Sequence, residues 1–317
     1  MNNKSKGYIL AIALTIIAVS LVGYKLKSSG VNFSIFDKKH EETWGSEVPP
    51  NNGSEKDGTS EVENSTNNKS NEIVFSKDEE QMLNSLPICD KIRNSFNYPD
   101  KEEIHNKLFN AVDNFNSCKG EFIEEKPTSN TLTKGTFIID TENKTSVILD
   151  DTKGREPVTL IYHDNKRKVF DDNDKSYREF DEVIPKGNHS TVRPLKLFLN
   201  PEFNRDDLSY LGIGRYIICS DAVLTYLFIY EDWDYTEITF LERESYKLEG
   251  VIDASLTSMY NGPFSLIMDK ETGIILQYLS FDENGNVKYK LECTSLDINT
   301  PIDESVYNKD SSGYTKK

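Results

Sequence analysis

The sequence predicts an α+β fold in which a curved antiparallel β-sheet, a half-barrel of about ten strands, is covered by helices and follows one N-terminal transmembrane helix. Three observations lead to this prediction. Residues 7–24 form an uncharged, mostly apolar run, residues 76–119 carry helix signals, and residues 120–296 contain short apolar segments separated by turn residues. Consecutive short strands with hairpin-sized turns are typical of an antiparallel sheet.

The uncharged run at 7–24 has the length of a membrane span. Its eighteen residues would form a helix of roughly 27 Å, close to the hydrocarbon thickness of a bilayer. Lysines flank the run on both sides, and tyrosines stand near its ends, where interfacial aromatic residues belong. Residues 1–27 are therefore expected to be an uncleaved membrane anchor. The residues expected in the span include Gly7, Tyr8, Leu10, Ile16, Leu21 and Tyr24.

The alternative to an anchor is a cleaved signal peptide. No clean small-x-small cleavage site follows the apolar run, and lysines mark its end, so the anchor is favoured. Only six residues precede the span, and a long C-terminal domain is translocated largely regardless of its charge. We therefore expect a single-pass protein of the cell membrane, with a cytoplasmic N-terminus and the bulk of the chain outside the cytoplasm.

The formal net charge of −16 is distributed unevenly. Residues 1–40 carry +5 (six Lys, one Asp) and residues 41–72 carry −6 (eight acids, two Lys), which leaves −15 for residues 73–317. A surface this acidic does not attract nucleic acid over a broad area. Residues 41–72 are dominated by Asn, Ser, Glu and Gly and offer too little apolar surface to offset the entropy of ordering. We therefore predict a disordered linker over residues 28–72.

Two helices are predicted where the folded domain begins. The first opens at Ser76, which has capping-box spacing to Glu79, and it runs toward Phe96 under strain from Pro87. The predicted organisation is an extracytoplasmic domain over 73–307, with its N-terminal helices within 73–119, and a flexible tail at 308–317.

The second predicted helix starts at Pro99 and Asp100 and ends at Gly120. Glu103 is expected to complete another capping box. Its apolar residues fall on one stripe, which is typical of a helix packed against a core. These residues are Ile104, Leu108, Val112 and Phe115.

Strands are predicted on both sides of a less regular middle region. Phe137 and Ile139 show the period-two alternation of a half-buried strand. In the middle region, a short helix is predicted to begin at Asn200. Ser220 and Asp221 are expected to cap a second helix over 222–233, although its Tyr, Phe and Ile residues would equally suit a strand. The predicted strands are 120–126, 134–140, 144–150, 156–163, 167–171, 175–180, 235–241, 245–252, 263–268, 274–281 and 286–296.

Several segments carry a family resemblance by their order and spacing. They are WDYTEI from Trp233, ESYKLEG from Glu244, FSLIMDKETG from Phe264, YLSFDENG from Tyr278 and NTPIDESV from Asn299, together with FNAVDNF from Phe109 leading into KGEF from Lys119. In that order they resemble the bacterial LolA/LolB/RseB-like lipoprotein-carrier superfamily, especially its membrane-anchored relatives in Gram-positive bacteria. The resemblance covers roughly residues 100–307.

The resemblance implies a half-open antiparallel barrel whose concave face is covered by helices. In that superfamily, the space between sheet and helices accepts acyl chains or exposed segments of lipoproteins and partner proteins, and the fold is not known as catalytic. This chain departs from the family pattern in two respects. It has additional helical sequence at 73–98, and its expected anchor does not fit a carrier that shuttles between two membranes.

Residue patterns for catalysis or metal binding are weak. His40, His105, His163 and His189 lack the mutual spacing of zinc ligands. The run from Asp171 to Asp174 lacks the glycine and the later glutamate of a calcium loop, which favours a solvated turn, and Gly212-Ile-Gly214 favours a chain bend over a nucleotide site. No nucleophile-elbow or phosphate-loop motif is present. We expect no catalytic residues, no metal site, no cofactor and no enzyme.

The four cysteines permit three disulfide connectivities. They are Cys89, Cys118, Cys219 and Cys293. In a helical hairpin turning near residue 98, Cys89 and Cys118 would lie roughly 16 Å apart, too far for a disulfide. Only a sharp break at Pro87 or an arrangement other than a hairpin would bring them together. Cys219 and Cys293 have apolar neighbours, as buried free thiols commonly do.

An aromatic run could line a hydrophobic groove, although such a run is more often core. Its groove candidates are Tyr226, Phe228 and Tyr230. The function expected is that of a membrane-tethered binding domain that accepts lipid, lipoprotein or an extended protein segment between sheet and helices. The alternative is an interaction or scaffold module of a cell-envelope complex with a fully packed interior. The oligomeric state does not follow from the sequence.

Overall fold

The computed structural model describes residues 75–184, 208–218, 226–257 and 260–317. All of them belong to the compact unit that spans residues 71–317. The predicted transmembrane segment, the linker and the helix expected at Asn200 lie outside the described residues. Within the described ranges, no helix is both long enough and apolar enough to cross a membrane.

The first helical region is divided in two, as the strain expected from Pro87 suggested. Helix α3 (Lys77–Ser85) begins with the predicted capping box: the backbone NH of Glu79 donates to Ser76 Oγ (3.2 Å), and the NH of Ser76 donates to Glu79 Oε2 (2.7 Å). The chain leaves the helical conformation at Leu86, which fits the preference of a residue that precedes proline. Helix α4 (Cys89–Asn94) and the 3-10 turn η1 (Ser95–Asn97) complete the region.

Helix α5 (Pro99–Phe109) is shorter than predicted, and its expected capping box is absent. Its N-cap is Tyr98, without a side-chain cap, and Pro99 occupies the first turn, where its missing NH costs nothing. A 3-10 turn, η2 (Ala111–Asp113), follows. Gly120 does not end the helix but lies in strand β1, where a side chain would overlap the carbonyl oxygen of Ser295 on the neighbouring strand. The absence of a side chain at Gly120 therefore allows β1 and β11 to pack closely.

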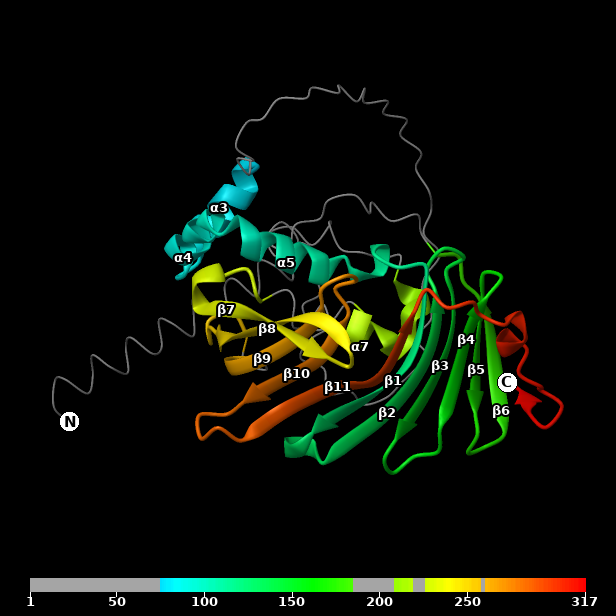
Figure 1. Ribbon diagram of the computed structural model, residues 1–317. Coiled ribbons are helices and arrows are strands. Elements are labelled where there is room, and N and C mark those ends of the chain that lie inside the picture. Colours follow the sequence, from blue (N-terminus) through cyan, green and yellow to red (C-terminus); the bar gives the residue numbers. More distant parts are fainter. Residues whose placement is uncertain (1–74, 185–207, 219–225, 258–259) are drawn as a thin grey trace, which may run out of the picture. The chain divides into compact units, whose positions relative to one another are not determined.

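One sheet of twelve strands contains every strand of the described ranges (Figure 1). The order is β12-β6-β5-β4-β3-β2-β1-β11-β10-β9-β8-β7, and all neighbours pair antiparallel except β12 with β6. The predicted α+β class with a largely antiparallel sheet is confirmed. The strands are β1 (Ser117–Lys126), β2 (Thr131–Asp140), β3 (Thr145–Thr152), β4 (Val158–His163), β5 (Lys166–Asp171), β6 (Ser176–Asp181), β7 (Trp233–Phe240), β8 (Arg243–Ile252), β9 (Gly262–Asp269), β10 (Ile275–Phe281), β11 (Val287–Ile298) and β12 (Thr315–Lys316).

The segment predicted as a helix over 222–233 is helical only in a short turn within its described part. That turn is η6 (Tyr230–Asp232). The backbone NH of Tyr230 donates to Ser95 Oγ (2.9 Å), and the indole NH of Trp233 donates to the carbonyl of Leu227 (2.8 Å). These bonds to side chains occupy backbone groups that a regular helix would pair internally.

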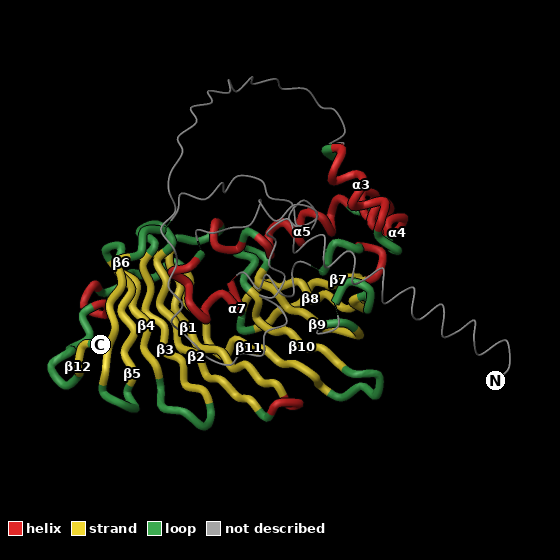
Figure 2. Tube along the Cα trace, turned by 180° about the vertical axis from the view of Figure 1, so that it is seen from behind, coloured by secondary structure: helices red, strands yellow, loops and turns green. Residues whose placement is uncertain are grey.

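The main hydrophobic core lies between one face of the sheet and the helices that cover it. Figures 1 and 2 show the curved sheet with α5 and α7 (Arg215–Ile218) on the same side. Leu108 of α5 and Ile217 of α7 are fully buried in this core together with residues of the strands. The 3-10 segment η5 (Ser209–Gly214) enters α7 through a kink at Gly212, whose φ of 51° confirms the predicted chain bend. We call this side of the sheet the covered face.

The C-terminal segment packs on the opposite face of the sheet. Tyr307 is buried there with Ile161 and Phe170, and Tyr314 packs against the same cluster. Strand β12 then pairs in parallel with β6, with Thr315 opposite Ser176. Residues 308–317, expected to be a flexible tail, therefore include a strand that covers part of a sheet edge.

Acid is expected to release this C-terminal segment. The Tyr314 hydroxyl donates a hydrogen bond to Asp172, and this bond, with Lys309 and Lys175 nearby, lowers the pKa of Asp172 below its ordinary value of 3.8. A group with a lowered folded-state pKa contributes stability that is fully present above the unfolded pKa and is lost as the pH falls through the folded value. The Tyr314 ring signals in an NMR titration should therefore shift in acid. The Asp172→Asn variant is the control, and an unchanged transition in that variant would contradict the prediction.

Candidate binding site

The covered face carries a group of polar and aromatic side chains at one end of β1, β10 and β11. We call it the tyrosine layer. In the sheet, Ser280 of β10 lies opposite Tyr289 of β11. Leu291 of β11 lies opposite Tyr278 of β10 on one side and opposite Glu124 of β1 on the other. The strand register therefore brings these side chains to one face, since alternate residues share a face. The layer consists of Glu124, Tyr216, Tyr226, Tyr260, Tyr278, Ser280 and Tyr289.

Glu124 is a buried carboxylate with two partners. It is 4% exposed, its Oε1 accepts a hydrogen bond from the Tyr289 hydroxyl (2.9 Å), and Lys126 Nζ lies 3.0 Å from the same oxygen. A charge in such surroundings is stable only when it is paired and hydrogen-bonded. The Lys126 ammonium also lies 5.8 Å from the centroid of the Tyr289 ring.

The tyrosines of this layer remain protonated at neutral pH. Burial, followed by the charge of Glu124, raises the pKa of Tyr289 well above its ordinary value. The same two causes, with a smaller contribution from Tyr226, raise the pKa of Tyr260 to about 12. Their hydroxyls are therefore hydrogen-bond donors and not anions.

Two buried hydroxyls of the layer have no hydrogen-bond partner in the described part of the chain. Tyr278 Oη and Ser280 Oγ are both fully buried. Burial raises the pKa of Tyr278 and the nearby Ser280 hydroxyl acts in the opposite direction, so the two hydroxyls lie close together, but their geometry is not that of a hydrogen bond. Such atoms are rare in native proteins, and a bound polar group or an ordered water commonly accounts for them. The surrounding aromatic rings are in contact: centroid separations are 6.3 Å for Tyr226–Tyr260, 6.2 Å for Tyr260–Tyr289 and 5.7 Å for Tyr289–Tyr278.

The three groove candidates taken from the sequence lie in different surroundings. Tyr226 is partly buried and belongs to the tyrosine layer. Phe228 is 1% exposed and packs with the helices α3 and α4 through residues that include Leu83. Tyr230 is 5% exposed and packs edge-on against Trp233. Only Tyr226 is therefore near the unpartnered hydroxyls.

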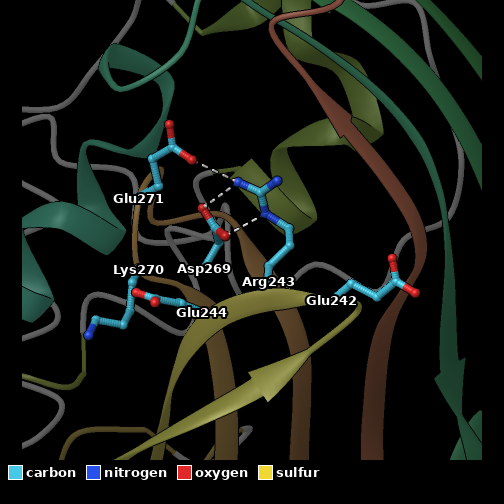
Figure 3. A pocket seen from close by; sticks show the side chains of 6 residues that line it. All are labelled: Glu242, Arg243, Glu244, Asp269, Lys270 and Glu271. Atoms are coloured by element: carbon cyan, nitrogen blue, oxygen red, sulfur yellow. Dashed lines mark hydrogen bonds and ion pairs between the residues drawn. The ribbon is translucent and has the colours of Figure 1, made fainter.

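A pocket of about 480 Å³ lies elsewhere, between the turn of the β7–β8 hairpin and the β9–β10 turn (Figure 3). The guanidinium of Arg243 forms an ion pair with Asp269, with Nε 2.6 Å from Oδ2. The same guanidinium lies 3.1 Å from the carboxylate of Glu271. Arg243 therefore pairs with two of the four acids of this pocket, and the six lining side chains together keep a formal charge of −2. All six of its lining residues are charged: Glu242, Arg243, Glu244, Asp269, Lys270 and Glu271.

The histidines and cysteines are not gathered into a reactive site within the described ranges. His105 is buried beside the Tyr230 hydroxyl, and His163 stacks on Tyr307. Among the residues that the structure covers, no cluster of His, Cys, Asp or Glu could hold a metal ion. The structure describes three cysteines, all free thiols: Cys89, Cys118 and Cys293. The remaining two histidines and one cysteine, His40, His189 and Cys219, lie outside the described residues.

Sequence reasoning did not find Glu124, Tyr278, Ser280 or Tyr289. A usable signal existed, because period-two spacing puts Tyr278 and Ser280 on one face of a strand. That signal does not say which strand lies beside which. Strands β1 and β11 are far apart in sequence yet adjacent in the sheet, so the layer becomes visible only with the topology.

No family model and no curated protein matches the sequence. Solved structures that are similar include MucB of Pseudomonas aeruginosa in complex with MucA (TM-score 0.38, 14% identity, 67% of this chain and 62% of that chain covered). A LolA superfamily protein of Nitrosomonas europaea matches with a TM-score of 0.25 and 11% identity, over 64% of this chain and 96% of that chain. An outer membrane lipoprotein-sorting protein domain of Vibrio parahaemolyticus matches with a TM-score of 0.24 and 14% identity, over 65% of this chain and 95% of that chain.

The Nitrosomonas europaea protein is a member of the LolA superfamily, which is among the groups that the sequence segments resemble. The match spans less than two thirds of the MucB chain, since 62% of that chain is covered.

Proposed function

We propose that this chain is a non-catalytic binding domain that takes an amphipathic ligand, a lipid or the acylated part of a lipoprotein, between its sheet and the covering helices. The observation that carries the proposal is the pair of buried hydroxyls of Tyr278 and Ser280, which have no hydrogen-bond partner of good geometry among the described residues. They lie on an aromatic wall whose carboxylate, Glu124, is already paired. Ligand sites are predominantly apolar, with a few polar groups that fix the orientation of the ligand. The two hydroxyls would bind the polar head and the rings would contact the chain.

The proposal includes the anchor expected from the sequence. Residues 7–24 would hold the domain at the cell membrane, on its extracytoplasmic side, and residues 28–72 would provide reach. A tethered domain of this kind would receive its ligand from the adjacent bilayer or from a protein in it. The acidic charge of residues 73–317 favours neutral or hydrophobic partners over polyanions.

Lipid content and lipid uptake of the fragment 71–317 test this proposal. Solvent extraction and native mass spectrometry should find a co-purified amphiphile, and a fluorescent acyl probe with a polar head should bind. The Tyr278→Phe variant should bind the probe roughly tenfold more weakly, while its stability is unchanged or increased, because an unpartnered buried hydroxyl is removed. A fragment without ligand that takes up no acyl probe would contradict the proposal.

The matched control is Tyr307→Phe, on the other face of the sheet. Tyr307 is also buried, and its hydroxyl accepts a hydrogen bond from Thr145 at 2.7 Å. This variant should lose stability by about 1 kcal/mol and bind the probe as the unchanged chain does. Equal loss of probe binding in both variants would indicate a general effect of stability and not a polar contact with the ligand.

One observation favours the second candidate, an interaction module with a packed interior. The buried residues of α5, η5, α7 and the strands form one continuous apolar cluster. A domain packed in this way would bind its partners on the outside. It would show no lipid uptake, and Tyr278→Phe would alter stability alone.

A further inference from the structure

The edge strand β7 is open in the described part of the chain. It is the last strand at one end of the sheet, and among the described strands it pairs with β8 alone. The register runs without a bulge from Trp233 opposite Gly250 to Phe240 opposite Arg243. No other backbone group of the described residues pairs with residues 234–240. Within the described residues, the outer side of β7 from 234 to 240 therefore has NH and C=O groups without a backbone partner.

The opposite edge of the sheet is protected. Strand β12 pairs with β6 at Ser176 and Tyr177, and it brings Lys316 and Lys317 to that edge. A short covering strand and lysine side chains are two devices by which proteins prevent the addition of foreign strands. The two edges of the sheet therefore differ in their protection against the addition of a strand.

Strand β7 has none of these protective devices. It contains no lysine, no proline and no bulge over eight residues. Its exposed side chains are threonines and acids: the side chains of Asp234 and Glu237 are 94% and 66% exposed, although Lys101 and Lys270 lie 2.7 Å and 3.1 Å from them. Thr236 and Thr239 are also exposed. An incoming strand would meet these small or acidic side chains.

Neighbouring residues hold β7 in an extended conformation. Lys101 of α5 donates to the backbone carbonyls of Tyr230 and Trp233 and pairs with Asp234, while the Tyr235 hydroxyl donates to Asp100 at 3.1 Å. These contacts fix the strand before any partner arrives. A preorganised site loses less entropy on binding.

We propose that β7 is a docking edge for an extended, lysine- or arginine-containing segment of a partner protein, which adds to the sheet as a further strand. Strand addition is a known way to recognise extended peptides through their main chain. Charge selects the partner here, because cross-strand pairs of opposite sign are favourable. A second copy of β7 would bring the same acids, and residues 41–72 of the chain itself are acidic. This site is separate from the covered face, so it can exist whether or not that face takes a lipid.

The test uses the full chain in neutral detergent and an eight-residue peptide of alternating lysine and valine. Fluorescence anisotropy should show binding, and hydrogen exchange should slow specifically within residues 233–240. The same peptide with every second amide N-methylated should not bind, because it cannot complete a strand pair. A glutamate–valine peptide should bind at least fivefold more weakly. Binding of the N-methylated peptide equal to that of the parent, or unchanged exchange in β7, would overturn the proposal.

A pair of charge variants distinguishes the edge from the general charge of the protein. Thr236→Lys adds a cation on β7 and should weaken binding of the lysine peptide roughly fivefold, while strengthening binding of the glutamate peptide. Thr136→Lys adds the same cation to the exposed side of the central strand β2 and should leave both affinities unchanged. Equal effects of the two variants would overturn the docking edge. Loss of lipid uptake in the experiments on Tyr278 would leave these results unaffected.

Discussion

Replacement of Asp269 by alanine is expected to lower the free energy of unfolding by about 3 kcal/mol. Asp269 is 1% exposed. Its carboxylate accepts hydrogen bonds from the NH (2.8 Å) and the hydroxyl (2.7 Å) of Thr272 and from Arg243 Nε (2.6 Å). Alanine would leave these donors without an acceptor in a mostly buried position. Chemical denaturation of the unchanged chain and the variant gives the difference directly.

Glu271→Gln is the matched control for Asp269. Glu271 contacts the same guanidinium at 3.1 Å, but its side chain is 72% exposed. Exposed ion pairs contribute little, so this variant should lose less than about 1 kcal/mol. If both variants lost the same stability, the buried network around Asp269 would not be what joins the β7–β8 hairpin to the β9–β10 turn.

Replacement of Gly273 by alanine is expected to cost roughly 3 kcal/mol, because two unfavourable effects add. Gly273 has a φ of +82°, a conformation that costs an L-residue energy, and a Cβ atom there would overlap the backbone carbonyl of Lys107 in α5. The turn lies against this helix, as the bond from Lys107 Nζ to the carbonyl of Lys270 (3.0 Å) also shows. The variant should therefore separate the turn from α5 as well as strain its backbone.

A substitution at Gly285 measures the cost of the positive φ without the steric overlap with α5. Its φ is +79°, nearly the same, but a Cβ atom there would meet nothing within 4 Å. Gly285→Ala should cost only the backbone term, about 1 kcal/mol. Thermal or chemical denaturation of both variants is the measurement. Equal losses would mean that the approach of the β9–β10 turn to α5 contributes nothing.

Local features of the fold could be predicted from the sequence. The capping box of Ser76 and Glu79 needs only three residues of spacing, and a break at Pro87 follows from one residue. The break between the predicted strands 263–268 and 274–281 and the alternation around Phe137 are equally local, and each lies where it was expected. Interactions within a few residues of sequence decide these elements.

Features that depend on distant residues could not be predicted. Helix α5 ends at Phe109 and not at Gly120, because β1 must begin early enough to pair with β11. Residues 308–317 look polar and mobile in sequence, yet their aromatic and hydrogen-bonding residues meet partners more than a hundred positions away. The tyrosine layer has the same cause. Its members come from strands that sequence order does not place together.

The strand order has a consequence for folding kinetics. Strands β1–β6 and β7–β11 form two meanders in which every pair is local, and among the described strands the pairing of β1 with β11 is the one that joins them. At that seam, Phe122 lies opposite Cys293, 171 positions further along the chain (293 − 122). Closing so long a loop is entropically costly and slow. Substitutions in the seam should therefore slow folding of the domain, whereas equally destabilising substitutions in the outer hairpins should mainly speed its unfolding.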